Sequence, residues 1–402
     1  MRAAVVGGGL AGLAAALELV DAGHEVTLYE ARPTLGGKVQ TLPRREGDPE
    51  PPPDNGQHIA LGCFTEYLGF LERIGSTGGV KRVSLALPVI DERGRVATIG
   101  YGLLPLLRYR HIPLRDRLGV LRVLARVDRL EPAGRTFGGL LRAEGQSDAA
   151  VERFWDVFIR PALNLRCDDV DAEAALFTVR TALRSGRAAS DLVLPAGPLG
   201  ALHGEAARRV LEGAGAEVRT DARVEDLGEV DADAVVVAVP PEEASRLLGE
   251  SWSFELSPIV SAHLLFDRRI LHHELAALLG SPAHWVFDRG RLTWHEPETG
   301  QYLTVVSSGA PELMELRGRA LVGLLTRAVT DRLGEAELLW SRVSREPEAT
   351  IALRPGVRRP EAPALAGAWT AGWPPTMEQA VRSGRAAARA VLSDTATKVA
   401  AA

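Results

Sequence analysis

The sequence predicts an α/β protein of two domains, one built on a parallel sheet and a second α+β domain that combines an antiparallel sheet with helices. A strand–helix–strand pattern fills the first 30 residues, which is typical of a parallel sheet. Several short strand-like runs follow one another between residues 259 and 309, which favours an antiparallel sheet. The length of 402 residues suits two or three domains.

The domain boundaries are placed where these patterns change. The first domain is discontinuous and takes residues 1–75, 190–255 and 350–395. The second domain takes residues 76–189 and 256–349, and residues 396–402 are expected to form a flexible tail.

The composition is that of an ordinary globular protein. Hydrophobic residues make up 46% and charged residues 25%, which excludes a disordered, collagen-like or coiled-coil chain. A net charge of −5 gives no basic field for nucleic acid. The two cysteines, Cys63 and Cys167, are too few for a disulfide framework or a metal cluster, and we expect both to be buried and no metal to bind. With no signal peptide and no run of roughly 20 apolar residues, we expect a cytoplasmic protein.

The first three elements are placed by apolar runs that glycines interrupt. We expect a buried strand at Ala3–Val6 and an Ala/Leu-rich helix at Leu10–Ala22, with Gly23 as its C-cap. The second strand is expected at Glu25–Tyr29.

Three glycines with the spacing G-x-G-x-x-G join the first strand to the first helix. Gly7 allows a tight turn, Gly9 lets the backbone approach a pyrophosphate at the helix N-terminus, and Gly12 allows the helix to pack closely on the strand. Glu30 ends the second strand, where a carboxylate can bind a ribose. This is a Rossmann-type dinucleotide-binding pattern, and the alternative is a tight turn with no ligand.

A second glycine pair, Gly36-Gly37, follows the second strand, with Lys38 directly after it. The segment resembles the second glycine motif of flavoprotein oxidases and desaturases, in which an arginine commonly follows the pair. Lysine keeps the charge but loses the planar guanidinium. A simple glycine turn after a strand is the alternative.

Residues 365–386 resemble the C-terminal flavin motif of the phytoene desaturase and flavin amine oxidase superfamily. A helix is expected to begin at Thr376, with free N–H groups around Met377 directed at the flavin C2 carbonyl. Gly384 would allow this helix to pack closely on the first domain. Ala368 replaces the acid expected after Gly367, so one contact to the cofactor sugar chain is missing. Taken alone the segment is equally an amphipathic terminal helix, but the two ends of the chain together predict FAD.

The remaining elements follow from periodicity and its interruptions. The proline-rich stretch Pro43–Asp54 is expected to be a surface loop. Further helices are expected at Thr65–Ile74, Pro198–Gly213, Leu313–Leu333 and Thr376–Leu392. Further strands are expected at Val218–Leu227, Ala234–Val239, Ile259–Phe266, His284–Phe287, Leu292–His295 and Tyr302–Val306.

Residues 100–130 are rich in arginine. At helical spacing Arg115, Arg122, Arg126 and Arg129 share one face. Three interpretations stay open: a solvated face, a surface for a partner protein, or a membrane-surface helix whose arginines meet anionic headgroups while leucines face the lipid.

Several segments together narrow the family: Asp54–His58, Leu61–Cys63, Pro161–Asn164 and Trp285–Asp288, with the C-terminal motif. Over most of its length the chain resembles the squalene-associated FAD-dependent desaturases, now understood as hydroxysqualene dehydroxylases. The resemblance implies that hydroxysqualene and reduced flavin give squalene, water and oxidised flavin, within squalene and hopanoid biosynthesis. Since such a substrate is nearly insoluble in water, it also favours a peripheral position at the inner face of the membrane. The electron donor is left open.

The resemblance also suggests roles for individual residues. His58 is the first candidate for the proton donor, and the alternative is a hydrogen bond to the cofactor or to a loop carbonyl. Asp54 is either catalytic or orients its loop. Trp285, Phe287 and Trp373 either line an apolar substrate pocket or belong to the core. The residues expected to bind FAD are Gly7, Gly9, Leu10, Ala11, Gly12, Glu30, Ala31, Arg32, Gly36, Gly37, Lys38, Gly56, Gln57, His58, Val224, Gly367, Trp369, Thr376 and Met377.

Two other kinds of function stay open. The first is desaturation of a carotenoid or of squalene by the same fold. The second is a flavin amine oxidase or a flavin-binding protein without catalysis. An amine oxidase commonly needs an aromatic cage and a lysine near the flavin, and an aromatic content of 5% argues against it.

Overall fold

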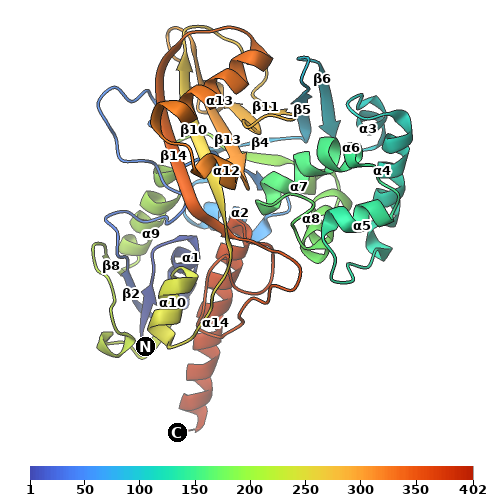
Figure 1. The fold of residues 1–402 in the computed structure, drawn as a ribbon. Coiled ribbons are helices and arrows are strands. Elements are labelled where there is room, and N and C mark those ends of the chain that lie inside the picture. The colour runs from blue at the N-terminus through green and yellow to red at the C-terminus, as the bar shows by residue number, and fades with distance from the viewer. Residues whose placement is uncertain (402) are drawn as a thin grey trace.

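The computed structural model describes residues 1–401, apart from the side chains of residue 184 and of residues 394–401. It combines a small parallel sheet, a large and mostly antiparallel sheet, and a lobe of helices (Figure 1). The prediction of a flexible tail at residues 396–402 falls largely outside the side chains described. The predicted domain boundaries stay a prediction.

The parallel sheet has four strands in the order β8-β2-β1-β9. They are β1 (Arg2–Val6), β2 (Glu25–Tyr29), β8 (Glu217–Arg219) and β9 (Ala234–Val237). Helix α1 (Leu10–Asp21) packs against both the sheet and the C-terminal helix α14 (Met377–Ala401). A Cβ on Gly384 would lie 2.0 Å from the carbonyl oxygen of Ala11, so only glycine lets α14 approach α1 this closely.

The large sheet has seven strands in the order β14-β10-β13-β12-β11-β5-β6, and every pairing is antiparallel except that of β11 with β5. The strands are β5 (Ala86–Ile90), β6 (Val96–Gly100), β10 (Leu256–Phe266), β11 (Leu275–Leu278), β12 (Trp285–Asp288), β13 (Gln301–Ser308) and β14 (Leu338–Ile351). The helices α12 (Pro311–Met314) and α13 (Gly318–Leu333) pack on it, around buried residues such as Leu264, Phe266 and Leu325.

A third sheet and the helical lobe complete the molecule. The third sheet has the order β3-β7-β4, formed by β3 (Ala60–Leu61), β4 (Val80–Val83) and β7 (Leu192–Pro195), and α2 (Thr65–Arg73) follows β3. The lobe contains α3 (Leu103–Arg108), α4 (Leu114–Arg126), α5 (Phe137–Ala143), α6 (Asp148–Ala150), α7 (Asp156–Leu163) and α8 (Ala172–Arg184). The remaining helices include α9 (Ala206–Gly213), α10 (Pro241–Leu248) and α11 (Arg289–Leu292). One apolar cluster joins the lobe to the large sheet, from Val120 and Trp155 to Phe287.

Two predicted strands are wrong in extent or type. Leu292–His295 is not a strand, because the Asp288 carboxylate accepts a hydrogen bond from the backbone N–H of Arg291 and turns the chain into α11. The strand expected at Val218–Leu227 ends at Arg219, where the chain turns through a left-handed residue, Asp221.

Two predicted helices also differ. The helix expected at Leu313–Leu333 is broken in two, and α13 begins at Gly318, whose φ of +49° suits glycine. Helix α14 runs past its expected end at Leu392 to Ala401. Within residues 1–401 no helix combines the length and apolar character needed to cross a bilayer. Both cysteines are buried and free, as expected.

Candidate functional site

The first glycine turn leaves no room for a side chain at Gly7 or Gly12. The backbone N–H of Gly7 donates to the carbonyl of Tyr29 at 2.8 Å, and Gly7 has a φ of +108°. A Cβ on Gly12 would lie 1.8 Å from the carbonyl oxygen of Gly7. Helix α1 begins directly after Gly9, so its first N–H groups face the space beyond the turn without intrahelical partners.

The second glycine pair lies against this turn. Gly36 donates its N–H to the carbonyl of Gly8 at 2.8 Å, and a Cβ on Gly37 would come within 3.0 Å of the Gly9 Cα. The Glu30 carboxylate accepts hydrogen bonds from the N–H groups of Gly8 at 2.7 Å and Arg32 at 2.9 Å. Two glycine motifs and one carboxylate therefore meet at the end of β1 and β2, as the sequence predicts.

Lys38 points away from the glycine turn toward the large sheet. Its ammonium donates to the carbonyls of Glu348 and, at 3.4 Å, Ala349 on β14. Burial lowers the pKa of the Lys38 ammonium. The side chain thus joins the cofactor side to the large sheet in this structure, and a direct contact with a pyrophosphate stays a prediction.

The start of α14 is organised by three polar side chains. Thr376 caps the helix, because its hydroxyl accepts from the N–H of Gln379 at 3.4 Å. The buried Gln379 amide accepts from the Trp373 N–H at 2.9 Å and donates to the carbonyl of Ala371 at 2.6 Å, which fixes the preceding loop. Glu378, which is fully buried, accepts from the Tyr67 N–H at 2.8 Å and so caps α2.

Trp369 and Val224, two further residues expected to bind FAD, are both buried. The Trp369 indole donates to the carbonyl of Val239 at 3.0 Å and packs against Trp252 and Phe254. The expectation that these two residues touch FAD stays a prediction.

The Asp54 carboxylate is the centre of a buried polar network. It pairs with the Arg289 guanidinium at 2.9 Å, and both side chains are 2% exposed. It also accepts from the Thr41 hydroxyl at 2.8 Å and from the Leu199 N–H at 3.0 Å. His263 on β10 donates from Nε2 to the carbonyl of Asp54 at 2.8 Å. Because this carboxylate is already fully engaged, its geometry suits a positioning residue better than a catalytic one.

This network fixes a loop that the sequence describes only as a surface loop. Arg289 also donates to the carbonyl of Pro52 at 2.7 Å. Arg342 on β14 pairs with Asp48 at 2.6 Å and donates to the carbonyl of Pro43. The side chains of Arg342 and Asp48 are 7% and 2% exposed, and Pro51, Pro53 and Asp54 are buried, so the end of the loop lies in the interior rather than at the surface.

The segment after Asp54 carries polar atoms that the described residues do not satisfy. Asn55 Oδ1 and Ser261 Oγ are buried without a hydrogen-bond partner among the described residues. A Cβ on Gly56 would lie 2.8 Å from Ser261 Oγ, so a side chain there would fill this space. Buried polar groups of this kind are normally satisfied, and a ligand or water must complete them.

His58 is half-buried, and its Nδ1 lies 3.4 Å from the carbonyl oxygen of Gly56. Burial lowers the pKa of the His58 imidazole, so the neutral form dominates at neutral pH. Gln57 beside it is also half-buried. A buried pair lies nearby, in which the Tyr67 hydroxyl is 2.8 Å from Nε2 of His203. Burial lowers the pKa of His203 to about 4, and the proximity of His58 contributes to this shift.

The three predicted pocket aromatics fall in two places. Trp285 and Phe287 stack on β12 with ring centroids 5.9 Å apart, within the apolar cluster that joins the sheet to the helical lobe. Trp373 precedes α14 and packs edge-on against Phe64 and Phe177. Whether any of the three lines a substrate pocket stays a prediction.

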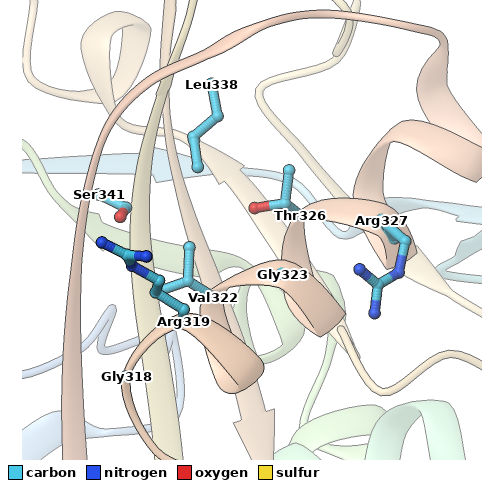
Figure 2. A pocket seen from close by; sticks show the side chains of 8 residues that line it. All are labelled: Gly318, Arg319, Val322, Gly323, Thr326, Arg327, Leu338 and Ser341. Atoms are coloured by element: carbon cyan, nitrogen blue, oxygen red, sulfur yellow. The ribbon is translucent and has the colours of Figure 1, made fainter.

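A surface hollow of about 520 Å³ lies between α13 and β14 (Figure 2). It is lined by Gly318, Arg319, Val322, Gly323, Thr326, Arg327, Leu338 and Ser341. None of these belongs to the glycine motifs, the Asp54 network or the aromatic positions, so the hollow is separate from the candidate site.

Comparison with known proteins agrees with this geometry. The model of the flavin containing amine oxidoreductases matches residues 10–392. The chain belongs to this family. It is 30% identical to hydroxysqualene dehydroxylase of Sinorhizobium fredii, over 98% of this chain and 99% of the relative. It is 23% identical to zeta-carotene desaturase of Synechocystis sp., over 98% of both chains. Cyclohexylamine oxidase of Brevibacterium oxydans shares the fold, with a TM-score of 0.72 at 15% identity over 98% of this chain and 99% of that one.

Membership of this family makes the chain an FAD-dependent oxidoreductase, and its residues fit the cofactor. The contacts at Gly7, Gly12 and Gly36 exclude side chains there, and the unsatisfied Asn55 and Ser261 atoms lie beside Gly56. Pyrophosphate binding at the start of α1, ribose binding by Glu30, and flavin contact by Gly56 and the start of α14 stay predictions. Bound FAD would supply two-electron redox chemistry, normally as a hydride.

Sequence reasoning missed the residues that hold this flavoenzyme's Asp54 loop. Arg289, His263 and Arg342 lie far along the chain from the loop, and no spacing links them to it. A weak signal exists, because charged residues inside otherwise apolar strand regions must find partners when they are buried.

Proposed function

We propose that this oxidoreductase is a hydroxysqualene dehydroxylase that reduces its substrate to squalene. The observation that carries the proposal is the similarity to the Sinorhizobium fredii hydroxysqualene dehydroxylase, which spans nearly the whole of both chains.

The proposed reaction replaces the hydroxyl group of the substrate with a hydride. Hydroxysqualene and reduced FAD give squalene, water and oxidised FAD. The hydroxyl leaves as water once it is protonated, and the allylic carbon bears the developing positive charge until it accepts the hydride. The protein must therefore hold the allylic carbon in place, supply a proton and exclude bulk water.

We assign the proton transfer to His58 and the positioning of its segment to Asp54. The pair with Arg289 holds the carboxylate, and the bond from His263 holds the adjoining carbonyl, so the chain that leads to His58 is fixed at its start. Because burial lowers the pKa of His58, only a fraction of the enzyme carries the proton at neutral pH. Turnover that depends on the imidazolium should then rise as the pH falls.

We further propose that the substrate comes from a bilayer and that the enzyme works at the cytoplasmic face of the membrane. The argument is chemical, since a C30 hydrocarbon chain has negligible solubility in water. A reductant must restore the reduced flavin after each turnover.

An anaerobic assay tests the reaction. Purified holoenzyme is reduced, hydroxysqualene is added, and squalene formation is measured with flavin reoxidation. We expect both in equal amounts. A flavin-loaded protein that gives no squalene would refute the proposal.

A second candidate is carotenoid desaturation, which the full-length similarity to the Synechocystis zeta-carotene desaturase favours. The two candidates differ in direction, because desaturation consumes oxidised flavin. Consumption of zeta-carotene or phytoene by the oxidised enzyme, without turnover of hydroxysqualene, would support this alternative.

A further inference from the structure

Helices α3 and α4 lie on the outer side of the helical lobe (Figure 1). Exposed apolar side chains lie on these two helices and just before α3. We call this set the elbow surface, and it consists of Tyr101, Leu103, Leu104, Leu114 and Leu118. The four leucines are 49% to 56% exposed. The other exposed large hydrophobics on the described residues, apart from the nearby Val96, come from separate elements: Leu248, Trp294, Leu339 and Val357. An apolar cluster of this kind on a surface typically marks an interaction site.

The leucines of the elbow surface lie on helix faces that point away from the core. Helix α3 buries Leu106 and leaves Leu103 and Leu104 outside. Helix α4 buries Val120 and Val123, which leaves its outer face to other residues. Leu114 and Leu118 are four residues apart, so they share that outer face. The two helices pack against each other, so the two pairs of leucines lie on neighbouring helices.

The charge around these leucines is one-sided. Arginines are exposed on or between α3 and α4 at Arg108, Arg110, Arg115 and Arg122. The acid within residues 101–122, Asp116, is 8% exposed, accepts a hydrogen bond from the Ser147 hydroxyl at 2.7 Å and lies 3.6 Å from the Arg115 guanidinium. It offsets part of the Arg115 charge, but the segment stays net positive, with four exposed arginines against one buried acid. Since the chain as a whole carries −5, the positive charge here is a local feature.

The arginines that surround the elbow surface differ from the set expected from the sequence. Arg126, on the face expected from the sequence, pairs with Glu144 at 2.9 Å. The apolar contribution comes from α3 and the first turns of α4, rather than from a single long helix that lies flat. The surface is thus an elbow of two short helices with arginines around it.

The apolar cluster continues inward from the elbow surface. Leu106, Ile112 and Val120 lie beneath it and belong to the same cluster as Trp285 and Phe287 on the large sheet. We propose that the elbow surface docks on an anionic bilayer, with its leucines in the acyl boundary and its arginines at the phosphates. This deepens the proposed function, because it names the membrane face through which a hydrocarbon substrate would arrive.

Vesicle flotation of the FAD-loaded protein tests the docking without any substrate. The test variant replaces Leu103, Leu104, Leu114 and Leu118 with Ser, and the matched control replaces two exposed leucines elsewhere, Leu248 and Leu339. The control is well placed, because Leu339 lies on β14, at the opposite edge of the large sheet from β6, to which α3 connects. We expect the test variant to lose binding to anionic vesicles by about tenfold or more and the control to bind as wild type.

A second variant separates the charge from the apolar contact. Replacement of Arg108, Arg110, Arg115 and Arg122 by Gln should weaken binding to anionic vesicles and abolish its salt dependence, while Arg126→Gln should change little. Equal binding by wild type and both test variants would overturn the proposal. So would a wild-type dimer that the leucine variant converts to a monomer with unchanged vesicle binding, since the surface would then serve a second copy of the chain.

Activity distinguishes this proposal from the reaction on which it rests. With detergent-dispersed hydroxysqualene the leucine variant should turn over as wild type, and with vesicle-embedded substrate it should be slower by about the factor lost in flotation. Vesicle binding without any dehydroxylation by wild type would sink the proposed function and leave the docking surface intact.

Discussion

The glycine layer and the Asp54 loop are held in place by opposite means. In the glycine layer, backbone meets backbone, as where Gly36 donates to Gly8 and Gly384 lies against Ala11. The Asp54 loop is held by buried charged side chains from elements far along the chain, above all Arg289 and Arg342. Close backbone contacts tolerate almost no substitution, whereas a buried ion pair tolerates removal of both partners better than removal of one.

The largest effect is expected from Arg289→Met, which leaves Asp54 buried without its counter-charge. We expect a loss of about 3–5 kcal/mol in the free energy of unfolding, measured with urea. The matched control is Arg354→Met, whose partners Asp169 and Glu255 are 39% and 57% exposed, and it should cost no more than about 1 kcal/mol. Combining Arg289→Met with Asp54→Asn should recover part of the loss. Equal losses of unfolding free energy for Arg289→Met and the control would contradict a larger contribution from the buried Asp54–Arg289 pair than from exposed pairs.

His58→Ala should act on the reaction and not on the fold. We expect dehydroxylation to fall by about 100-fold or more with FAD content unchanged, because the proton donor is removed. In wild type, turnover should rise as the pH falls below neutrality, since burial lowers the pKa of His58. The variant should lose this pH dependence. Unchanged turnover in the variant would remove His58 from the acid role.

Two glycines in helices provide a paired test of the glycine layer. Gly384→Ala places a Cβ 2.0 Å from the Ala11 carbonyl oxygen and should cost about 1–3 kcal/mol, with weaker retention of FAD. Gly69→Ala in α2 meets no atom within 4 Å and should stabilise the protein by about 0.5–1 kcal/mol. Thermal unfolding and flavin absorbance measure both. A Gly384→Ala protein as stable as wild type would refute the close backbone contact.

The smallest effect concerns acid stability. Burial lowers the pKa of His203 to about 4 and that of His263 to about 3, both from an ordinary value of 6.5. Below about pH 6.5 the unfolded chain therefore binds protons at these two histidines, whereas the folded chain does not. The free energy of unfolding then falls as the pH decreases, by about 1.4 kcal/mol per pH unit for each group. His203→Gln should reduce this slope between pH 6 and 5. Identical slopes in urea unfolding would contradict the assignment.

The sequence predicts the glycine layer well because its constraints are local. Gly7, Gly9 and Gly12 belong to one turn, and the structure leaves no room for a Cβ at Gly7 or Gly12, for reasons visible in a strand–turn–helix pattern. Thr376 is likewise a recognisable helix cap, and the structure confirms it.

The Asp54 loop could not be predicted in the same way. Its proline content indicates a loop, but the partners that bury it, Arg289 and His263, come from the large sheet and the helix that follows β12. The false strand at Leu292–His295 has a related cause, since a side-chain cap from Asp288 overrides the local apolar pattern. Long-range pairing and side-chain capping are properties of the fold, and periodicity does not record them.

The most direct test of the account follows the hydride. The reduced holoenzyme is equilibrated in deuterium oxide without oxygen and given hydroxysqualene for a single turnover, and the squalene is analysed by mass spectrometry. Hydride delivery from reduced FAD to the allylic carbon predicts squalene with one deuterium, formed as the flavin is reoxidised. No squalene, or squalene without deuterium, would contradict the account.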